Sequence, residues 1–132
     1  MEKELKPLSI NVNGLNAVVK RKQILSKLVK QYTDIVCLQE VHIKNQDKKY
    51  LEFNKLGKLH TALAEKKKGG VVIYTREEIE AKQIYADIKG KILILEIKLG
   101  QRQILLVNIY ASNKNQKEFY KKLHERIVET GQ

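Results

Sequence analysis

The chain contains a single cysteine, a single proline and no tryptophan among its 132 residues. One cysteine excludes an intrachain disulfide, so nothing in the sequence points to secretion. No apolar run approaches the roughly 20 residues of a membrane span, and the charged N-terminal segment lacks the apolar core of a signal peptide. These absences predict a soluble intracellular protein with no membrane partner.

Carboxylates are also in short supply. Lys and Arg number 26 against 15 Asp and Glu, which gives a formal net charge of +11. Such an excess favours a polyanionic partner, nucleic acid above all, although surface lysine also serves solubility. Apolar residues make up 42% of the chain, so its composition indicates a globular domain, or part of one, rather than a disordered segment.

The residue types of several common catalytic sites are scarce or badly spaced. Cys37 lies inside an apolar run, which predicts a buried, inert thiol rather than a nucleophile. His42, His60 and His124 share no ligand spacing, which disfavours a zinc site.

Hydrophobic periodicity predicts a β-α-β unit followed by a run of strands and a final helix. Leu8–Val12 alternates as a strand does, Lys20–Tyr32 has apolar residues at helical spacing, and Ile35–Leu38 is typical of a strand covered on both faces. Further strands are expected at Lys58–Ala64, Val71–Tyr74, Ile84–Ile88, Lys91–Leu99 and Ile104–Tyr110, with a short helix or irregular turn at Asn45–Leu56 and a closing helix at Lys114–Val128. This order predicts a layered α/β (α+β) domain with a mixed sheet and flanking helices.

Polar residues follow the first two predicted strands. Asn11 and Asn13 precede Gly14, and Gln39 and Glu40 end the second strand. A carboxylate and an amide at the ends of neighbouring strands suit a hard cation such as Mg²⁺. Plainer explanations are also open, because asparagines before glycine form turns and a glutamate at a strand end is usually just solvated.

Four segments carry a family resemblance when they are read in order. They are L-S-I-N-V-N-G-L-N (Leu8–Asn16), I-V-C-L-Q-E-V-H (Ile35–His42), G-G-V-V-I-Y (Gly69–Tyr74) and L-L-V-N-I-Y-A-S-N (Leu105–Asn113). Together they resemble the N-terminal half of the endonuclease/exonuclease/phosphatase superfamily, and most of all the apurinic-type endonuclease of LINE-type (non-LTR) retrotransposon reverse transcriptase proteins. The resemblance implies a partial DNase I-like sandwich in which each half of the complete domain contributes most of one sheet.

The resemblance also implies site residues. Glu40 matches the principal Mg²⁺ carboxylate, Asn11 an asparagine that contacts metal or the scissile phosphate, and Tyr110 an aromatic residue whose hydroxyl approaches the phosphate. The nucleic-acid-binding residues that it implies are Asn13, His42 and Asn113. The implied cofactor is Mg²⁺, with Mn²⁺ as its substitute, and the implied partner is DNA in the nucleus. Val41 and Ser112 depart from the threonine and proline that are common at these positions.

The sequence lacks the motifs that complete such a centre. The second half of the superfamily domain brings G-D-x-N and S-D-H, whereas the aspartates here are Asp34, Asp47 and Asp87, all ahead of Tyr110. His124 follows a leucine rather than an aspartate. No general base is therefore assigned, and residues that act as a unit fail together.

We therefore expect residues 1–132 to form one incomplete domain. It would carry half of a Mg²⁺-dependent phosphodiesterase whose family nicks DNA to prime target-site reverse transcription, with little activity alone. A lone half is expected to leave an apolar sheet face that the missing C-terminal half, or a second copy in a homodimer, would cover. The alternative is a non-catalytic basic nucleic-acid-binding or interaction module. A phosphatase of soluble phosphate esters fits the superfamily but not the closer LINE-type match.

Overall fold

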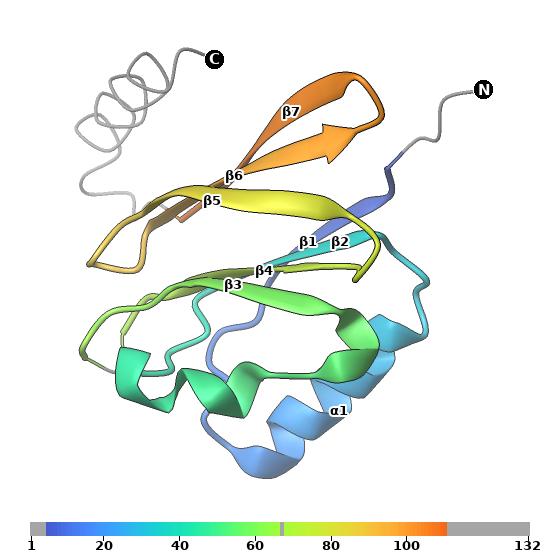
Figure 1. Cartoon of the computed structure of the whole chain (residues 1–132). Helices are drawn as coiled ribbons and strands as arrows, with labels where there is room; N and C mark the ends of the chain where they lie inside the picture. Colours follow the sequence, from blue (N-terminus) through green and yellow to red (C-terminus); the bar gives the residue numbers. More distant parts are fainter. Residues whose placement is uncertain (1–4, 67, 111–132) are drawn as a thin grey trace.

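The computed structural model describes residues 5–66 and 68–110. Two β-sheets stack on each other there, and helices lie on the outer face of the first sheet (Figure 1). The first sheet has the order β1-β2-β4-β3, with β1 at Pro7–Asn11, β2 at Ile35–Gln39, β3 at Lys58–Ala62 and β4 at Val71–Thr75. The second has the order β5-β6-β7, with β5 at Glu80–Ala86, β6 at Ile92–Leu99 and β7 at Arg102–Ile109. The described residues contain the helix α1 at Val18–Val29 and two 3₁₀ helices, η1 at Asn45–Leu51 and η2 at Asn54–Leu56.

The first sheet is mixed, as the sequence predicts. β1 and β2 pair in parallel with α1 as the crossover between them, which confirms the β-α-β unit. β4 runs antiparallel to both β2 and β3. In β2, Val36 and Leu38 belong to the cluster of buried side chains that includes α1, whereas Ile35 and Cys37 belong to the cluster shared with the second sheet. The continuous apolar run of β2 therefore reflects burial on both faces.

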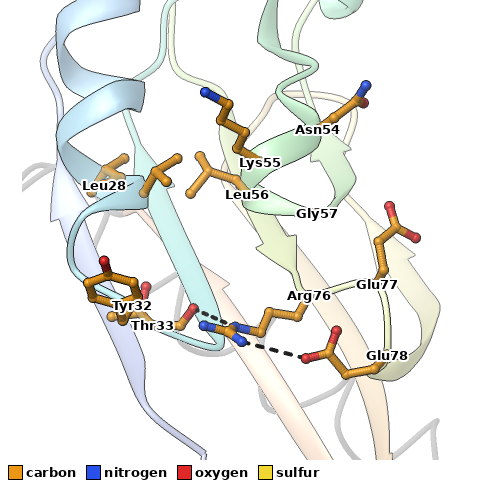
Figure 2. A pocket seen from close by; sticks show the side chains of 11 residues that line it. Leu28, Tyr32, Thr33, Asn54, Lys55, Leu56, Gly57, Arg76, Glu77 and Glu78 are labelled. Carbon is orange, nitrogen blue, oxygen red and sulfur yellow. Dashed lines mark hydrogen bonds and ion pairs between the residues drawn. The ribbon is translucent and has the colours of Figure 1, made fainter.

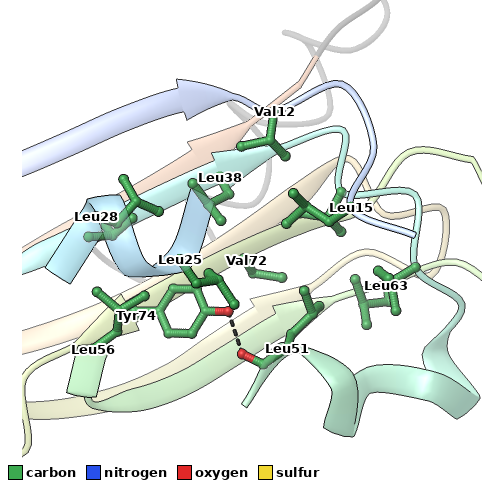
Figure 3. Close-up of a cluster of buried hydrophobic side chains, with 13 residues drawn as sticks. Val12, Leu15, Leu25, Leu28, Leu38, Leu51, Leu56, Leu63, Val72 and Tyr74 are labelled. Carbon is green, nitrogen blue, oxygen red and sulfur yellow. Dashed lines mark hydrogen bonds between the residues drawn. The ribbon is translucent and has the colours of Figure 1, made fainter. Parts of the chain in front are cut away.

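One hydrophobic core fills the space between α1 and the first sheet (Figure 3). Leu25 and Leu28 come from the helix, and Val72 and Tyr74 come from β4. The Tyr74 hydroxyl donates a hydrogen bond to the Leu51 carbonyl, so the end of η1 is held against this core. The polar tip of a buried tyrosine thus has a partner, as burial requires.

A second core lies between the two sheets and overturns one expectation. Ile73 and Cys37 of the first sheet pack there with Leu93 and Leu95 of β6. The expectation that this half would leave a sheet without its partner is wrong, because the strands after Arg76 form a sheet of their own that covers the first. Burial raises the pKa of the Cys37 thiol to about 11, in agreement with an inert side chain.

In the second sheet, one expected strand has different bounds and one expected hairpin is confirmed. β6 and β7 form the expected hairpin. The strand expected at Ile84–Ile88 instead occupies Glu80–Ala86, where the pairing register with β6 shifts between Gln83 and Tyr85. The helix expected at Lys114–Val128 lies outside the described residues. No helix within residues 5–66 and 68–110 has the length and apolar character needed to cross a bilayer.

Candidate active site

The loops that follow β1 and β2 run side by side and are joined through their main chains. The bonds are Val12 N to Gln39 O (3.0 Å), Gly14 N to Glu40 O (2.6 Å) and Leu15 N to Val41 O (2.8 Å). The parallel pairing of the two strands thus continues past their ends. This continuation brings the asparagines after β1 next to the glutamate after β2.

The turn before β4 supports the β2 loop from its other side. Val41 N donates to the carbonyl of Gly70 (3.2 Å), and His42 N donates to the carbonyl of Gly69 (2.9 Å). Gly70 has a φ of +95°, and a Cβ on it would lie 2.7 Å from the Val41 Cγ2 atom. Only glycine permits this approach, so the glycine doublet brings the turn against the loop that carries Glu40.

The loop ends contain unusual backbone conformations. Asn13, Glu40 and His42 have φ values of 50°, 53° and 56°, in the left-handed region that most side chains avoid. Such strain persists only where the surrounding structure fixes the residue, and it gathers at functional sites. Here the hydrogen bonds from Gly14 and to Gly69 fix the loop on both sides.

Glu40 and Tyr110 meet across the two sheets. Glu40 follows β2 in the first sheet, and Tyr110 follows β7 in the second. A hydrogen bond to the Glu40 carboxylate, together with partial burial and the negative charge of Glu40, raises the pKa of the Tyr110 phenol above its ordinary value of 10.0. The main chain of Tyr110 is held as well, because its N–H donates to the carbonyl of Lys91 at 2.9 Å. Two residues 70 positions apart in the sequence thus form one pair.

Asn11 lies close to this pair in the fold. It ends β1 opposite Gln39 in the register of the sheet, and its side chain is exposed. Its Oδ1 atom accepts a hydrogen bond from the N–H of Asn13 at 3.0 Å. This contact is a side-chain turn of the kind that the Asn-x-Asn-Gly pattern favours. The Lys20 amine donates to the carbonyl of Asn13 at 3.1 Å and secures the same loop.

His42 lies over the glycine of the β1 loop. A Cβ on Gly14 would stand 3.2 Å from His42 Nδ1, and the Asn16 side-chain amide donates to the carbonyl of His42 at 2.6 Å. Asn13 and His42 therefore belong to adjoining loops at one end of the sandwich. Asn113, the third residue with an expected role in DNA binding, lies outside the described residues.

Asn108 is the residue at this end that sequence reasoning missed. It is only 3% exposed, and its amide nitrogen donates to the carbonyls of Leu38 (3.2 Å) and Val72 (2.8 Å). Its Oδ1 atom accepts a hydrogen bond from the Gln39 amide at 2.7 Å. That Gln39 amide also donates to the hydroxyl of Ser9 at 3.0 Å. Asn108 thereby fixes β7, which leads to Tyr110, against the strand that leads to Glu40.

The chain also matches a family of known proteins. A family model described as the endonuclease/exonuclease/phosphatase family matches residues 8–126, most of the chain. The chain belongs to the endonuclease/exonuclease/phosphatase family.

Solved structures extend the comparison to the fold of this endonuclease/exonuclease/phosphatase domain. The AP endonuclease LMAP from Leishmania major is similar with a TM-score of 0.69 and 17% identity over 82% of this chain and 40% of that one. The Xenopus laevis APE2 catalytic domain is similar with a TM-score of 0.60 and 16% identity, over 81% of this chain and 45% of that one. A truncated Caenorhabditis elegans TDP2 is similar with a TM-score of 0.62 and 20% identity, over 95% of this chain and 57% of that one. The chain thus spans about half the length of these structures, and the likeness confirms the partial DNase I-like fold.

A surface hollow elsewhere on the endonuclease/exonuclease/phosphatase domain does not include this site. It measures about 340 Å³ and lies between the end of α1, η2 and the turn after β4 (Figure 2). Arg76 points across it to the Thr33 carbonyl (3.4 Å) and to Glu78 (3.6 Å). Its residues precede β2, precede β3 or follow β4, at the end of the first sheet opposite to Glu40. The hollow is therefore separate from the Glu40–Tyr110 pair.

Titration of Tyr110 provides a direct check of its contact with Glu40. Glu40→Gln removes the carboxylate charge, so the pKa of Tyr110 is expected to fall toward 10.0. A raised pKa favours the protonated phenol in the folded state. Its stabilising contribution is therefore complete below pH 10 and is lost as pH rises through the folded-state pKa. The measurement is an NMR titration of ¹³C-labelled tyrosine, assigned with Tyr110→Phe. An unchanged Tyr110 titration in Glu40→Gln would contradict the contact.

Proposed function

We propose that this domain supplies the metal-binding side of a Mg²⁺-dependent phosphodiesterase centre in a LINE-type endonuclease that nicks DNA. The observation that carries the proposal is the Glu40–Tyr110 pair, formed where the two sheets come together beside the exposed amide of Asn11. A carboxylate, an amide and a phenol together suit a phosphate group and a hard cation. The net charge of +11 favours a polyanionic substrate.

The donor set fits Mg²⁺. The Glu40 carboxylate lies beside the Tyr110 phenol, and its two oxygens have lone pairs for a cation. Asn11 Oδ1 also accepts one bond and has a second lone pair. Within the part of the chain that the structure describes, no three His, Cys, Asp or Glu side chains gather as a metal-binding group. Mg²⁺ needs no such cage, because one or two carboxylates, waters and substrate phosphate complete its coordination.

Each residue has a distinct part in the proposed chemistry. A bound Mg²⁺ supplies Lewis-acid polarisation of a phosphoryl oxygen. Glu40 would hold the ion, with Asn11 as a second oxygen ligand or as an N–H donor to the phosphate. Tyr110 would donate a hydrogen bond to a phosphate oxygen as charge develops there. Gln39 and Asn108 keep the two strand ends in register.

We further propose that these 132 residues alone have low activity. They would form an incomplete domain, and its C-terminal half would supply the missing groups. Activation of water requires an aspartate–histidine pair of the S-D-H kind, which the sequence does not contain. A homodimer would bring no such pair either, so a second copy would not complete the centre. The basic charge and the single site carboxylate also favour a second candidate function, a non-catalytic nucleic-acid-binding module.

Nicking of supercoiled DNA separates the two candidates. The chain alone is expected to give little or no nicking. After addition of the C-terminal half of a LINE-type endonuclease domain that carries G-D-x-N and S-D-H, Mg²⁺-dependent nicking should appear. Glu40→Ala should abolish it, whereas Glu65→Ala, at an exposed loop residue, should not. DNA binding without any nicking in the completed domain would overturn the enzyme proposal in favour of the binding module.

A further inference from the structure

Positive charge is distributed unevenly along the chain. Residues 5–33 contain Lys6, Lys20, Arg21, Lys22, Lys27 and Lys30 but none of the 15 carboxylates. Most of these cations lie on α1, on the outer face of the first sheet (Figure 1). No acidic side chain on this helix offsets them. Phosphate groups near the outer face of α1 therefore meet no repulsion from carboxylates of the helix itself.

The basic residues of α1 divide into two groups by their contacts. Lys20 and Arg21 are engaged with the site loop: Arg21 donates to the carbonyls of Leu15 (3.1 Å) and Asn16 (3.4 Å). The Arg21 guanidinium also lies 5.2 Å from the centre of the Tyr50 ring. These two cations hold protein structure in place and are not free for a ligand.

Lys22, Lys27 and Lys30 form the second group. They are exposed, and together with Gln23 and Ser26 they line a shallow hollow of about 480 Å³. Among the described residues, no hydrogen bond or ion pair engages any of the three amines. Lys30, the C-cap of α1, follows Lys22 by eight positions, a rise of about 12 Å, which spans three to four base-pair steps of a duplex.

From this arrangement we propose that Lys22, Lys27 and Lys30 form a second anchor for the phosphate backbone of duplex DNA, separate from the Glu40 centre. The choice of DNA as the polyanion rests on the proposed function. The apolar side of α1 argues against a membrane as the partner, because Leu25 and Leu28 are buried against the first sheet and cannot enter lipid. The three amines contact phosphates and no bases, so the anchor is independent of sequence.

The test is DNA binding by the full 132-residue chain in EDTA, which removes metal and cleavage from the measurement. A fluorescently labelled duplex of about two helical turns reports the dissociation constant over a range of salt concentrations. The test variant combines Lys22→Gln, Lys27→Gln and Lys30→Gln, since glutamine keeps the helix propensity close to that of lysine. The matched control combines Lys55→Gln, Lys82→Gln and Lys98→Gln, where the last two lie opposite Glu96 and Glu80 in the sheet.

The expected result is a smaller salt dependence for the α1 variant only. The slope of log K against log salt should fall by about two to three, because each lost phosphate contact removes about 0.9. The control should keep the wild-type slope. If the triple variant does not fold, each single lysine variant should lower the slope by about 0.9.

The anchor is overturned if the slope is unchanged in the α1 variant, or if it falls equally in the control. It is also overturned if the α1 variant loses binding to anionic phospholipid vesicles but not to DNA. Loss of the anchor is therefore read from salt dependence, and failure of the proposed catalytic function is read from nicking.

Discussion

Replacement of Asn108 by alanine is expected to lower the free energy of unfolding by about 3 kcal/mol or more. The side chain is buried between the sheets and makes three hydrogen bonds, with the carbonyls of Leu38 and Val72 and with the amide of Gln39. Its removal leaves buried polar groups without partners, at about 1–3 kcal/mol for each group, and leaves a cavity as well. The measurement is unfolding in urea.

The matched control for Asn108 is Gln103→Ala on the same strand. Gln103 is exposed, so its truncation should change stability by no more than about 0.5 kcal/mol. Asn108→Ala should also bring the pKa of Tyr110 closer to its ordinary value, because β7 would no longer be held against the strand that leads to Glu40. A variant that loses stability but keeps the wild-type Tyr110 titration would show that Asn108 is structural and does not position the site.

Replacement of Gly57 by alanine is expected to cost at least about 4 kcal/mol or to prevent folding, which places it among the severe single substitutions. Gly57 joins η2 to β3 with a φ of +106°. A Cβ there would lie 2.1 Å from the carbonyl oxygen of Thr75 and 2.9 Å from the Cα atom of Arg76. Both contacts are with main chain, which cannot rotate away. One of the two strands must therefore move, and the edge of the first sheet must open.

Gly100 provides the control for Gly57. It also has a positive φ, +64°, but a Cβ there would meet nothing within 4 Å. Gly100→Ala should therefore show the left-handed backbone cost alone, about 1–2 kcal/mol. The yield of soluble protein and the thermal midpoint of the two variants provide the comparison. Similar losses in both would mean that β3 and β4 do not approach at Gly57 as closely as the structure shows.

The sequence predicts the strands whose burial is uniform and misjudges those whose burial changes along their length. Ile35–Leu38 and Val71–Tyr74 are apolar throughout because they lie in the middle of a two-sheet stack, and the observed strands are each one residue longer than expected. β5 is an edge strand in the order of the second sheet, with exposed Glu80, Lys82 and Gln83, so its first half reads as a loop. The register shift at Gln83 and Tyr85 also breaks the period-two pattern.

Hydrophobic periodicity cannot predict the contact between Glu40 and Tyr110, because that contact depends on how the two sheets stack. Only the resemblance of the ordered segments to a known family assigned both residues to one site. The buried position of Asn108 could have been predicted, because it is the lone polar residue in the apolar stretch from Ile104 to Ile109. A polar side chain in such a stretch must find partners when it is buried. The left-handed backbone of Glu40 could not be predicted from the sequence, because glutamate is not a residue type that favours this conformation.

The left-handed conformation of Glu40 has a consequence for how such a gene would change with time. A glutamate there costs about 1–2 kcal/mol of backbone strain that glycine would relieve and asparagine would reduce. While selection maintains chemistry, that loss of stability is tolerated. If stability is selected but the proposed chemistry is not, mutation to glycine or asparagine would be favoured rather than merely neutral. The residue at position 40 would then change before the buried positions do, and its identity would record how recently the chemistry was under selection.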